Sequence, residues 1–246
     1  MVVDHPTTGD IAADAPEPRD DLRRGRFGAD ELAEVPPDLS DIPSPEDYRA
    51  AVDAEYRKHA IETGCARVRE IEHNEITPAL RRIESADPTR HLVGLENRLK
   101  SEARLTEKVE NWLKADAALT GEEAFGLVKD AVRYTLQYPD DQYTVGVRAD
   151  CERLRDEGFE PVDLKNTWDN DEYKGVNTRW RTPESGQLFE VQFHTEASFE
   201  AKQETHAAYE RIRDPATPHS EITGLRDYQR DICGRIPIPP DAREIR

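Results

Sequence analysis

The alternation of apolar and polar side chains changes near residue 44. Residues 1–43 are rich in Pro, Asp and Ala and show little apolar periodicity, so they cannot bury enough surface to offset the entropy of ordering them. From Ser44 the spacing becomes helical, with a Ser cap, Pro45 in the first turn and apolar positions recurring through Val68. The pattern predicts a disordered, acidic, proline-rich arm over 1–43 and a helical lead-in over 44–90.

Beyond residue 90, segments with helical spacing alternate with segments rich in β-branched and aromatic residues. The lead-in itself fits one long helix or two shorter ones, followed by a helical segment that begins near Pro78. Further helices are expected over 102–116, 121–130, 142–158, 196–213 and 218–234. Strands are expected over 91–101, 131–138, 159–168, 175–182 and 187–195. This order predicts an α+β (α/β mixed) domain over 91–235, with a mixed sheet of about five strands flanked by helices, and a tail over 236–246.

Charge and cysteine content narrow the function classes. The formal net charge is −18, and residues 1–53 contribute half of it, with 14 acidic and 5 basic side chains. Such a balance argues against a general nucleic-acid binder. No apolar run approaches the length of a membrane span or of a signal peptide core, so no membrane association is expected. Cys65, Cys151 and Cys233 lie in no metal-ligand spacing, and we expect reduced, buried thiols.

A polar strand face is the first candidate for chemistry. In the stretch GQLFEVQFHT, residues 186–195, the side chains of Glu190, Gln192 and His194 are two positions apart and point to one face of a strand. They could line a polar site. The alternative is an ordinary solvent-exposed strand face.

A basic cluster precedes the helix expected at 102–116. Its members lie just before the helix or in its first turns: Arg98, Lys100, Ser101, Arg104 and Lys108. Free backbone N–H groups, the positive end of the helix dipole and cations together favour phosphate. A solvated basic helix edge is the alternative.

Two carboxylates and a loop aromatic complete the candidate set. Asp130, where a helix gives way to a strand, and Glu190 could hold Mg²⁺, which takes a few carboxylates together with substrate phosphates. Asp130 could instead cap a helix or pair with Arg133. Tyr173, in the loop DNDEYKGVNT, could stack on a nucleotide base or pack in the interior.

From about Leu95 to Tyr209, these stretches resemble, in this order, the synthetase domain of the RelA/SpoT family. That family moves pyrophosphate from ATP to the 3′-hydroxyl of another nucleotide, and the resemblance implies a nucleotidyltransferase-like sheet. It also implies an ATP site built from the match to RLKSEARLTEK and a nearby arginine: Arg98, Lys100, Ser101, Lys108 and Arg133. Asp130 and Glu190 would bind Mg²⁺, with Glu190 also assisting deprotonation of the attacking hydroxyl.

The resemblance extends to the acceptor side. Tyr173 matches the tyrosine that stacks on the acceptor base, and Asn177 stands where histidine is common. The strand pattern Glu-x-Gln-x-Arg-Thr is matched by EVQFHT, with His194 in place of arginine. The implied acceptor-binding residues are Tyr173, Asn177, Lys165, Gln192 and His194, although Lys165 could equally be an ordinary surface lysine. The acidic stretch 169–172 replaces the lysine usual before the tyrosine, which puts a guanine preference in question.

The lead-in and the stretches KNTW, YKGVNT and EVQFHT look more like the synthetase domains of bacterial toxins and secreted adenine-nucleotide pyrophosphokinases than like small housekeeping synthetases. This implies (p)ppApp or (p)ppGpp synthesis by a growth-inhibiting toxin that acts in the cytoplasm, either as made or delivered as part of a larger protein. Such a toxin would be neutralised by an antitoxin, an immunity protein or an enzyme that hydrolyses the product. Two alternatives stay open. One is pyrophosphorylation of the tRNA 3′-CCA end, and the other is a catalytically silent nucleotide-binding module.

Overall fold

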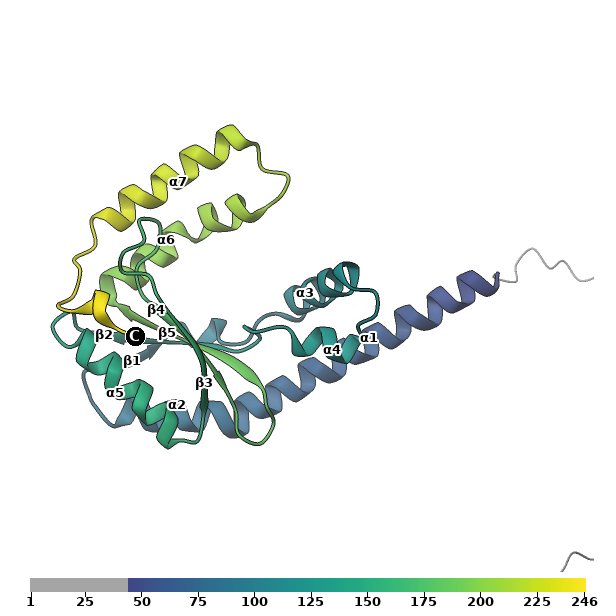
Figure 1. The fold of residues 1–246 in the computed structure, drawn as a ribbon, viewed down its shortest axis with the longest axis horizontal. Helices are drawn as coiled ribbons and strands as arrows, with labels where there is room; N and C mark the ends of the chain where they lie inside the picture. The colour runs from purple at the N-terminus through teal and green to yellow at the C-terminus, as the bar shows by residue number, and fades with distance from the viewer. Residues whose placement is uncertain (1–43) are drawn as a thin grey trace, which may run out of the picture. The chain divides into compact units, whose positions relative to one another are not determined.

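A five-stranded mixed sheet organises residues 44–246, the part of the chain that the computed structural model describes (Figure 1). The arm expected over 1–43 lies outside the described residues. The strands are β1 (His91–Val93), β2 (Arg133–Tyr138), β3 (Glu160–Asn166), β4 (Val176–Arg181) and β5 (Leu188–Thr195). Their order in the sheet is β1-β2-β5-β4-β3, and only the β2–β5 pair is parallel among the described strands. The expected α+β class with about five strands is confirmed.

Helices cover both faces of this sheet. They are α1 (Pro45–Ile71), α2 (Thr77–Ser85), α3 (Glu102–Ala115), α4 (Gly121–Gly126), α5 (Tyr143–Asp156), α6 (Glu196–Arg213) and α7 (His219–Gly234). Helices α2 and α5 lie on one side of the sheet, while α6 and α7 lie on the other (Figure 1). The expected helix over 121–130 is shorter than predicted, because the chain leaves the helix after Gly126 and turns toward β2.

The lead-in is one long helical run. Between α1 and α2, the segment Glu72–Ile76 forms a π-helical turn whose flanking residues keep helical dihedral angles. Pro78 explains the wider turn, because proline has no N–H to donate and its ring clashes with the carbonyl four residues earlier. A π turn placed just before the proline lets the helix continue.

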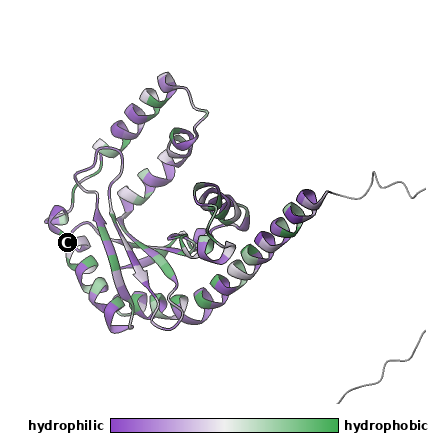
Figure 2. Ribbon diagram, turned by 45° about the vertical axis from the view of Figure 1, so that its right-hand side comes forward, coloured by the Kyte–Doolittle hydropathy of each residue, from purple (hydrophilic) through white to green (hydrophobic). Residues whose placement is uncertain are grey.

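Side-chain alternation along the central strands separates an apolar face from a polar one. Strand β5 buries Phe189, Val191 and Phe193 completely, and neighbouring β2 buries Tyr134 and Leu136. These side chains join the apolar sides of α2 and α5 in one core that includes Leu80, Ile83, Val147 and Leu154. In Figure 2 apolar residues run along the strands among polar ones. The intervening side chains therefore face the opposite side, toward α3 and α6.

The segment expected as a long strand over 91–101 forms only a short one. Gly94 has a φ of +64°, which turns the chain out of β1. A 3-10 turn then spans Leu95–Asn97, and pairing resumes only as a single bridge between Leu99 and Val132. The alternation expected through this stretch is therefore lost.

The proline-rich segment 236–246 packs back onto the domain. The Nδ2 atom of Asn166 donates to the carbonyl of Ala242 at 2.8 Å and to that of Ile245 at 3.1 Å. Thr144 on α5 donates to the carbonyl of Pro240 at 2.6 Å, and the Ile245 side chain is buried. These contacts tie the segment to α5 and β3.

The three cysteines are free and buried, as their spacing predicts. Burial raises the pKa of the Cys151 thiol to about 11, which keeps it protonated. Among the described helices, none combines the length and the apolar character that crossing a membrane requires.

We predict that Gly175→Ala destabilises the protein by about 1–3 kcal/mol, because strained backbone has this order of cost. Gly175 has a φ of +152°, and an added Cβ would lie 2.9 Å from Cε1 of His194 and 3.1 Å from the carbonyl oxygen of Phe193. Urea unfolding measures the change. The matched control is Gly224→Ala within α7, where an added Cβ meets no atom within 4 Å and better helix propensity should stabilise by about 0.5–1 kcal/mol. Equal effects of the two substitutions would contradict the prediction.

Candidate active site

The polar face of the sheet carries two rows of facing side chains. In the first row, Glu190 on β5 lies between Arg133 on β2 and Arg179 on β4. The second row, one step along the strands, runs across four strands as Thr135, Gln192, Asn177 and Lys165. The strand pairing thus gathers on one surface several of the residues singled out from the sequence.

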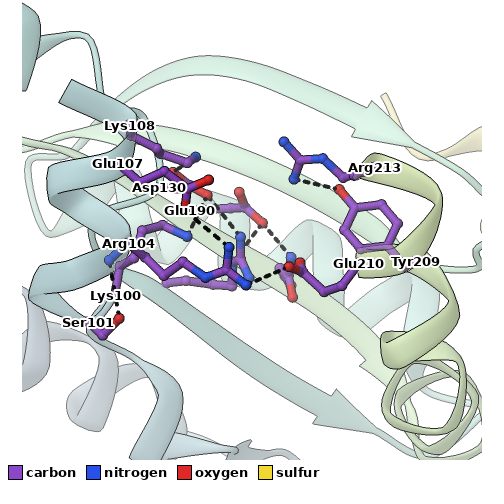
Figure 3. Close-up of polar contacts among 12 residues, drawn as sticks. Lys100, Ser101, Arg104, Glu107, Lys108, Asp130, Glu190, Tyr209, Glu210 and Arg213 are labelled. Atoms are coloured by element: carbon purple, nitrogen blue, oxygen red, sulfur yellow. Dashed lines mark hydrogen bonds and ion pairs between the residues drawn. The ribbon is translucent and has the colours of Figure 1, made fainter. Parts of the chain in front are cut away.

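Asp130, just before β2, is held by three cations (Figure 3). The Nζ atom of Lys108 donates to its Oδ1 at 2.6 Å, while Nζ of Lys100 and Nη2 of Arg133 lie 3.2 and 3.1 Å from its Oδ2. Burial alone would raise the pKa of Asp130, but the Lys108 hydrogen bond and the charges of the three cations outweigh it and lower that pKa. The carboxylate is therefore ionised at neutral pH.

Arg133 connects the two candidate metal-binding carboxylates. Its Nη2 contacts Asp130, and its Nε lies 3.4 Å from Oε1 of Glu190. That Nε has no well-aligned hydrogen-bond partner, so its contact with Glu190 is electrostatic. Glu190 also accepts a hydrogen bond from Nε2 of Gln192. Both carboxylates keep part of their surface open, at 17% for Asp130 and 15% for Glu190, so a ligand can reach them.

The start of α3 faces this cluster. Ser101 caps the helix, with its Oγ accepting from the backbone N–H of Arg104 at 3.4 Å. Lys100 precedes the cap, and burial lowers its pKa although Asp130 opposes the effect. Arg104 reaches across to Glu210 on α6 at 2.8 Å, which links the two helices over the site (Figure 3).

Arg98 lies outside this cluster, although the sequence places it two residues before Lys100. Its φ and ψ of −67° and −30° are helical, so the face shared in an extended chain is not formed. The Nε atom of Arg98 instead donates to Oε1 of Glu72 at 2.8 Å. Glu72 also accepts from Tyr134, whose side chain points to the face opposite Arg133. The structure therefore directs Arg98 away from Asp130.

Tyr173 points its hydroxyl into the domain. It donates to Oδ1 of Asn177 at 2.9 Å, and the same hydroxyl oxygen lies 2.9 Å from Nε2 of His194. His194 is fully buried and also contacts Ser198 Oγ. Burial, aided by the nearby Lys202 charge, lowers the pKa of His194 well below its ordinary value, so the ring is neutral. Tyr173 is thus fixed at its hydroxyl end, while part of its surface stays accessible. Lys165 is exposed on β3.

Lys202 on α6 is a site residue that the sequence interpretation missed. Its Nζ donates to Oε1 of Gln192 at 2.5 Å and lies 5.3 Å from the centroid of the Phe199 ring. Burial and the charge of Arg133 lower the pKa of Lys202 to about 8. One signal was present in the sequence, because Lys202 follows the apolar Phe199 by three residues and residues at this spacing share a helix face.

The donor set suits Mg²⁺. Within residues 44–246, no three His, Cys, Asp or Glu side chains converge as a metal site would require. Mg²⁺, however, is commonly held by one or two carboxylates plus substrate phosphates and waters. Asp130 and Glu190 would supply those carboxylates.

Comparison with known proteins finds distant structural similarity. No family model and no curated protein matches the sequence. Similar solved structures include smu.1046c from Streptococcus mutans, with 16% identity and a TM-score of 0.49 over 72% of this chain and 91% of that one. Small alarmone synthetase 1 from Bacillus subtilis, bound to its product pppGpp, has 16% identity and a TM-score of 0.44 over 81% and 97%. A GTP pyrophosphokinase family protein from Streptococcus pneumoniae has 13% identity and a TM-score of 0.43 over 80% and 93%. Identities and TM-scores this low carry no argument about activity. Any inference about activity has to rest on the residues of the site.

We predict that Glu72→Gln lowers the free energy of unfolding by about 1–3 kcal/mol at neutral pH, the usual range for hydrogen bonds to a charged group. Burial would raise the pKa of Glu72, but hydrogen bonds from Thr77 and Tyr134 and the pairing with Arg98 lower it overall. A lowered folded-state pKa stabilises the fold above the ordinary range of glutamate, and that stability is lost as the pH falls through the lowered value. Urea unfolding across this pH range should show the variant and wild type converging in acid.

The control is Glu152→Gln, at a glutamate that is 72% exposed. It should leave stability nearly unchanged at every pH. A difference between Glu72→Gln and wild type that persisted unchanged into acid would contradict the prediction.

Proposed function

We propose that the chain is an ATP-dependent nucleotide 3′-pyrophosphokinase, which transfers the β,γ-pyrophosphate of ATP to the 3′-hydroxyl of a purine nucleotide. The observation that carries the proposal is the cluster in which Arg133 joins Asp130 to Glu190 while Lys100 and Lys108 surround Asp130. Two accessible carboxylates among several cations, at a helix start, match the needs of polyphosphate chemistry. The motif resemblance to RelA/SpoT synthetase domains supports the same reaction.

Transfer of pyrophosphate depends mainly on charge neutralisation and in-line placement. The acceptor 3′-oxygen bonds to the β-phosphorus of ATP, the bond between that phosphorus and the α,β-bridging oxygen breaks, and AMP leaves with that oxygen. Lys100, Lys108 and Arg133 would exchange their contacts with Asp130 for contacts with ATP phosphates. Mg²⁺, when bound by Asp130 and Glu190, would add to this neutralisation. Glu190 would accept the proton from the attacking hydroxyl.

Ser101 and Arg98, which the resemblance also assigns to ATP binding, do not contact Asp130 as Lys100, Lys108 and Arg133 do. Ser101 caps α3 and is exposed, so ATP phosphates could reach the start of that helix at this residue. Arg98 pairs with Glu72, so a role at ATP would require it to leave that carboxylate.

The acceptor would bind on the other side of Glu190. The partly exposed Tyr173 ring would stack on the base, with His194 and Asn177 fixing its hydroxyl. Gln192 and Lys165 lie in the adjoining row of the sheet, within which Lys165 would meet acceptor phosphates. The acidic stretch 169–172 would disfavour a long 5′-phosphate tail.

A biological consequence follows from this chemistry. Conversion of ATP and ADP or of GTP and GDP into (p)ppApp or (p)ppGpp would drain nucleotides and inhibit growth. A cell that makes such an enzyme would need a neutralising partner, either an antitoxin or immunity protein or an enzyme that hydrolyses the product.

The test is an assay with ATP and Mg²⁺ in which ADP, ATP, GDP, GTP and deacylated tRNA are offered separately. AMP release together with a new adenine or guanine tetra- or pentaphosphate, seen by chromatography, supports the proposal and gives the base preference. Label found only in tRNA would move the activity to the 3′-CCA end. No AMP with any acceptor would overturn the proposal in favour of a silent nucleotide-binding module.

We predict that Glu190→Gln lowers the rate of AMP release by about 100-fold or more, the usual range for loss of a general base. ATP affinity, measured by equilibrium dialysis, should stay within a few-fold of wild type because Lys100, Lys108 and Arg133 remain. The matched control is Glu152→Gln on α5, which should retain full activity. Turnover near the wild-type rate in the Glu190 variant would rule out this role.

Removal of the Tyr173 ring should weaken acceptor binding, whereas removal of its hydroxyl alone should not. For Tyr173→Ala we predict a loss of about 1–3 kcal/mol of acceptor affinity, the range for base stacking on an aromatic side chain. Tyr173→Phe keeps the ring and should retain most of that affinity. Acceptor dissociation constants from calorimetry measure both variants. Equal affinity in Tyr173→Ala and wild type would show that the ring does not stack on the acceptor.

A further inference from the structure

Lys202 on α6 contacts Gln192 on β5, the strand that carries Glu190. The proposed reaction gives this lysine no role. It projects from α6 onto the polar face of β5, where its Nζ donates to Oε1 of Gln192 at 2.5 Å. Gln192 in turn donates from Nε2 to Oε1 of Glu190. The three side chains form a hydrogen-bond chain in which the Lys202 ammonium donates to the Gln192 carboxamide and the carboxamide donates to the Glu190 carboxylate.

The chemistry of the three groups permits only one orientation of the amide. A lysine ammonium has donors and no acceptor, while an ionised carboxylate has acceptors and no donor. Gln192 satisfies both neighbours only when its oxygen faces Lys202 and its nitrogen faces Glu190. The opposite orientation would set donor against donor at one end and acceptor against acceptor at the other. Lys202 and Glu190 therefore favour the same orientation of the amide, with its NH₂ group toward Glu190.

The other groups that face Lys202 leave it few alternatives. Arg133 on β2 repels it, Glu190 attracts it, and neutral His194 on β5 lies near enough for the lysine to affect its pKa. Within α6, the ammonium lies over the Phe199 ring. The Lys202 ammonium donates its hydrogen bond to Gln192. Each hydrogen bond of the chain therefore points from Lys202 toward Glu190.

We infer that Lys202 is a positioning residue for Glu190, which orients the Gln192 carboxamide so that its NH₂ group holds the carboxylate toward the attacking hydroxyl. The inference deepens the proposed function and rests on it for the catalytic consequence. It assigns Lys202 no contact with ATP or with the acceptor.

The kinetic test compares Lys202→Met, Lys202→Arg, Gln192→Leu and the double variant Lys202→Met/Gln192→Leu. Loss of a residue that orients a catalytic group commonly costs about 10–100-fold, so kcat for AMP release should fall by this amount in Lys202→Met while KM for ATP changes little. Lys202→Arg keeps a cation and should recover most of kcat. The double variant should be no slower than Gln192→Leu alone, because Lys202 acts through the amide. Lys114→Met, at an exposed lysine of α3, is the matched control and should be unchanged.

Thermal unfolding of each variant separates a folding defect from a loss of positioning, and the Lys202→Arg comparison remains decisive if Lys202→Met is unstable. A wild-type kcat in Lys202→Met would overturn the inference and leave the proposed function intact. A double variant much slower than Gln192→Leu would also overturn it, because Lys202 would then act by another route.

A second measurement does not depend on turnover. The side-chain amide NMR signals of Gln192, assigned by their absence in Gln192→Leu, should shift and exchange faster in Lys202→Met but not in Lys202→Arg. Unchanged signals in Lys202→Met would overturn the positioning. If wild type releases no AMP while these signals still respond to Lys202, the positioning of the amide stands and the proposed reaction fails.

Discussion

The parallel pairing of β2 with β5 sets which side chains of these two strands lie side by side on the polar face. It places Arg133 opposite Glu190 and Thr135 opposite Gln192. A slip of one residue would send Glu190 into the apolar core and bring Val191 out to the cations, because strand side chains alternate. The register is held by the buried partners of the other face, where Tyr134 pairs with Val191. Apolar packing beneath the sheet thus determines the electrostatics above it.

The site also shows why total charge is a poor guide to local charge. The chain carries −18 overall, yet Asp130 is surrounded by Lys100, Lys108 and Arg133, and Lys202 lies nearby. Half-buried cations are costly unless they are paired, and Asp130 and Glu190 serve as their partners. Under the proposed function, the phosphates of ATP would take over that pairing. The carboxylates therefore stabilise a cluster of cations in a protein whose overall charge is acidic.

Features encoded by neighbouring residues could be predicted from the sequence. Helix α6 runs over 196–213 as expected because Thr195 caps it, and the alternation of β5 correctly separated Glu190 from the core. Features that depend on distant partners could not. Arg98 pairs with Glu72 because a 3-10 turn changes the direction of its side chain. Lys202 reaches the site only because α6 packs over β5. The strand order, and the packing of 236–246 against Asn166, likewise depend on contacts remote in sequence.

The central position of β5 has a consequence for how the chain reaches this fold. β5 is the last of the described strands to be synthesised, and it inserts between β2 and β4. Until it emerges from the ribosome, the β1–β2 and β3–β4 pairs exist as separate ribbons with open edges, which are prone to pair with other chains. Assembly of the sheet must therefore wait for this late strand, and a topology rich in such distant pairings folds slowly. Pairing of these open edges with other chains would then compete with folding while the protein is synthesised.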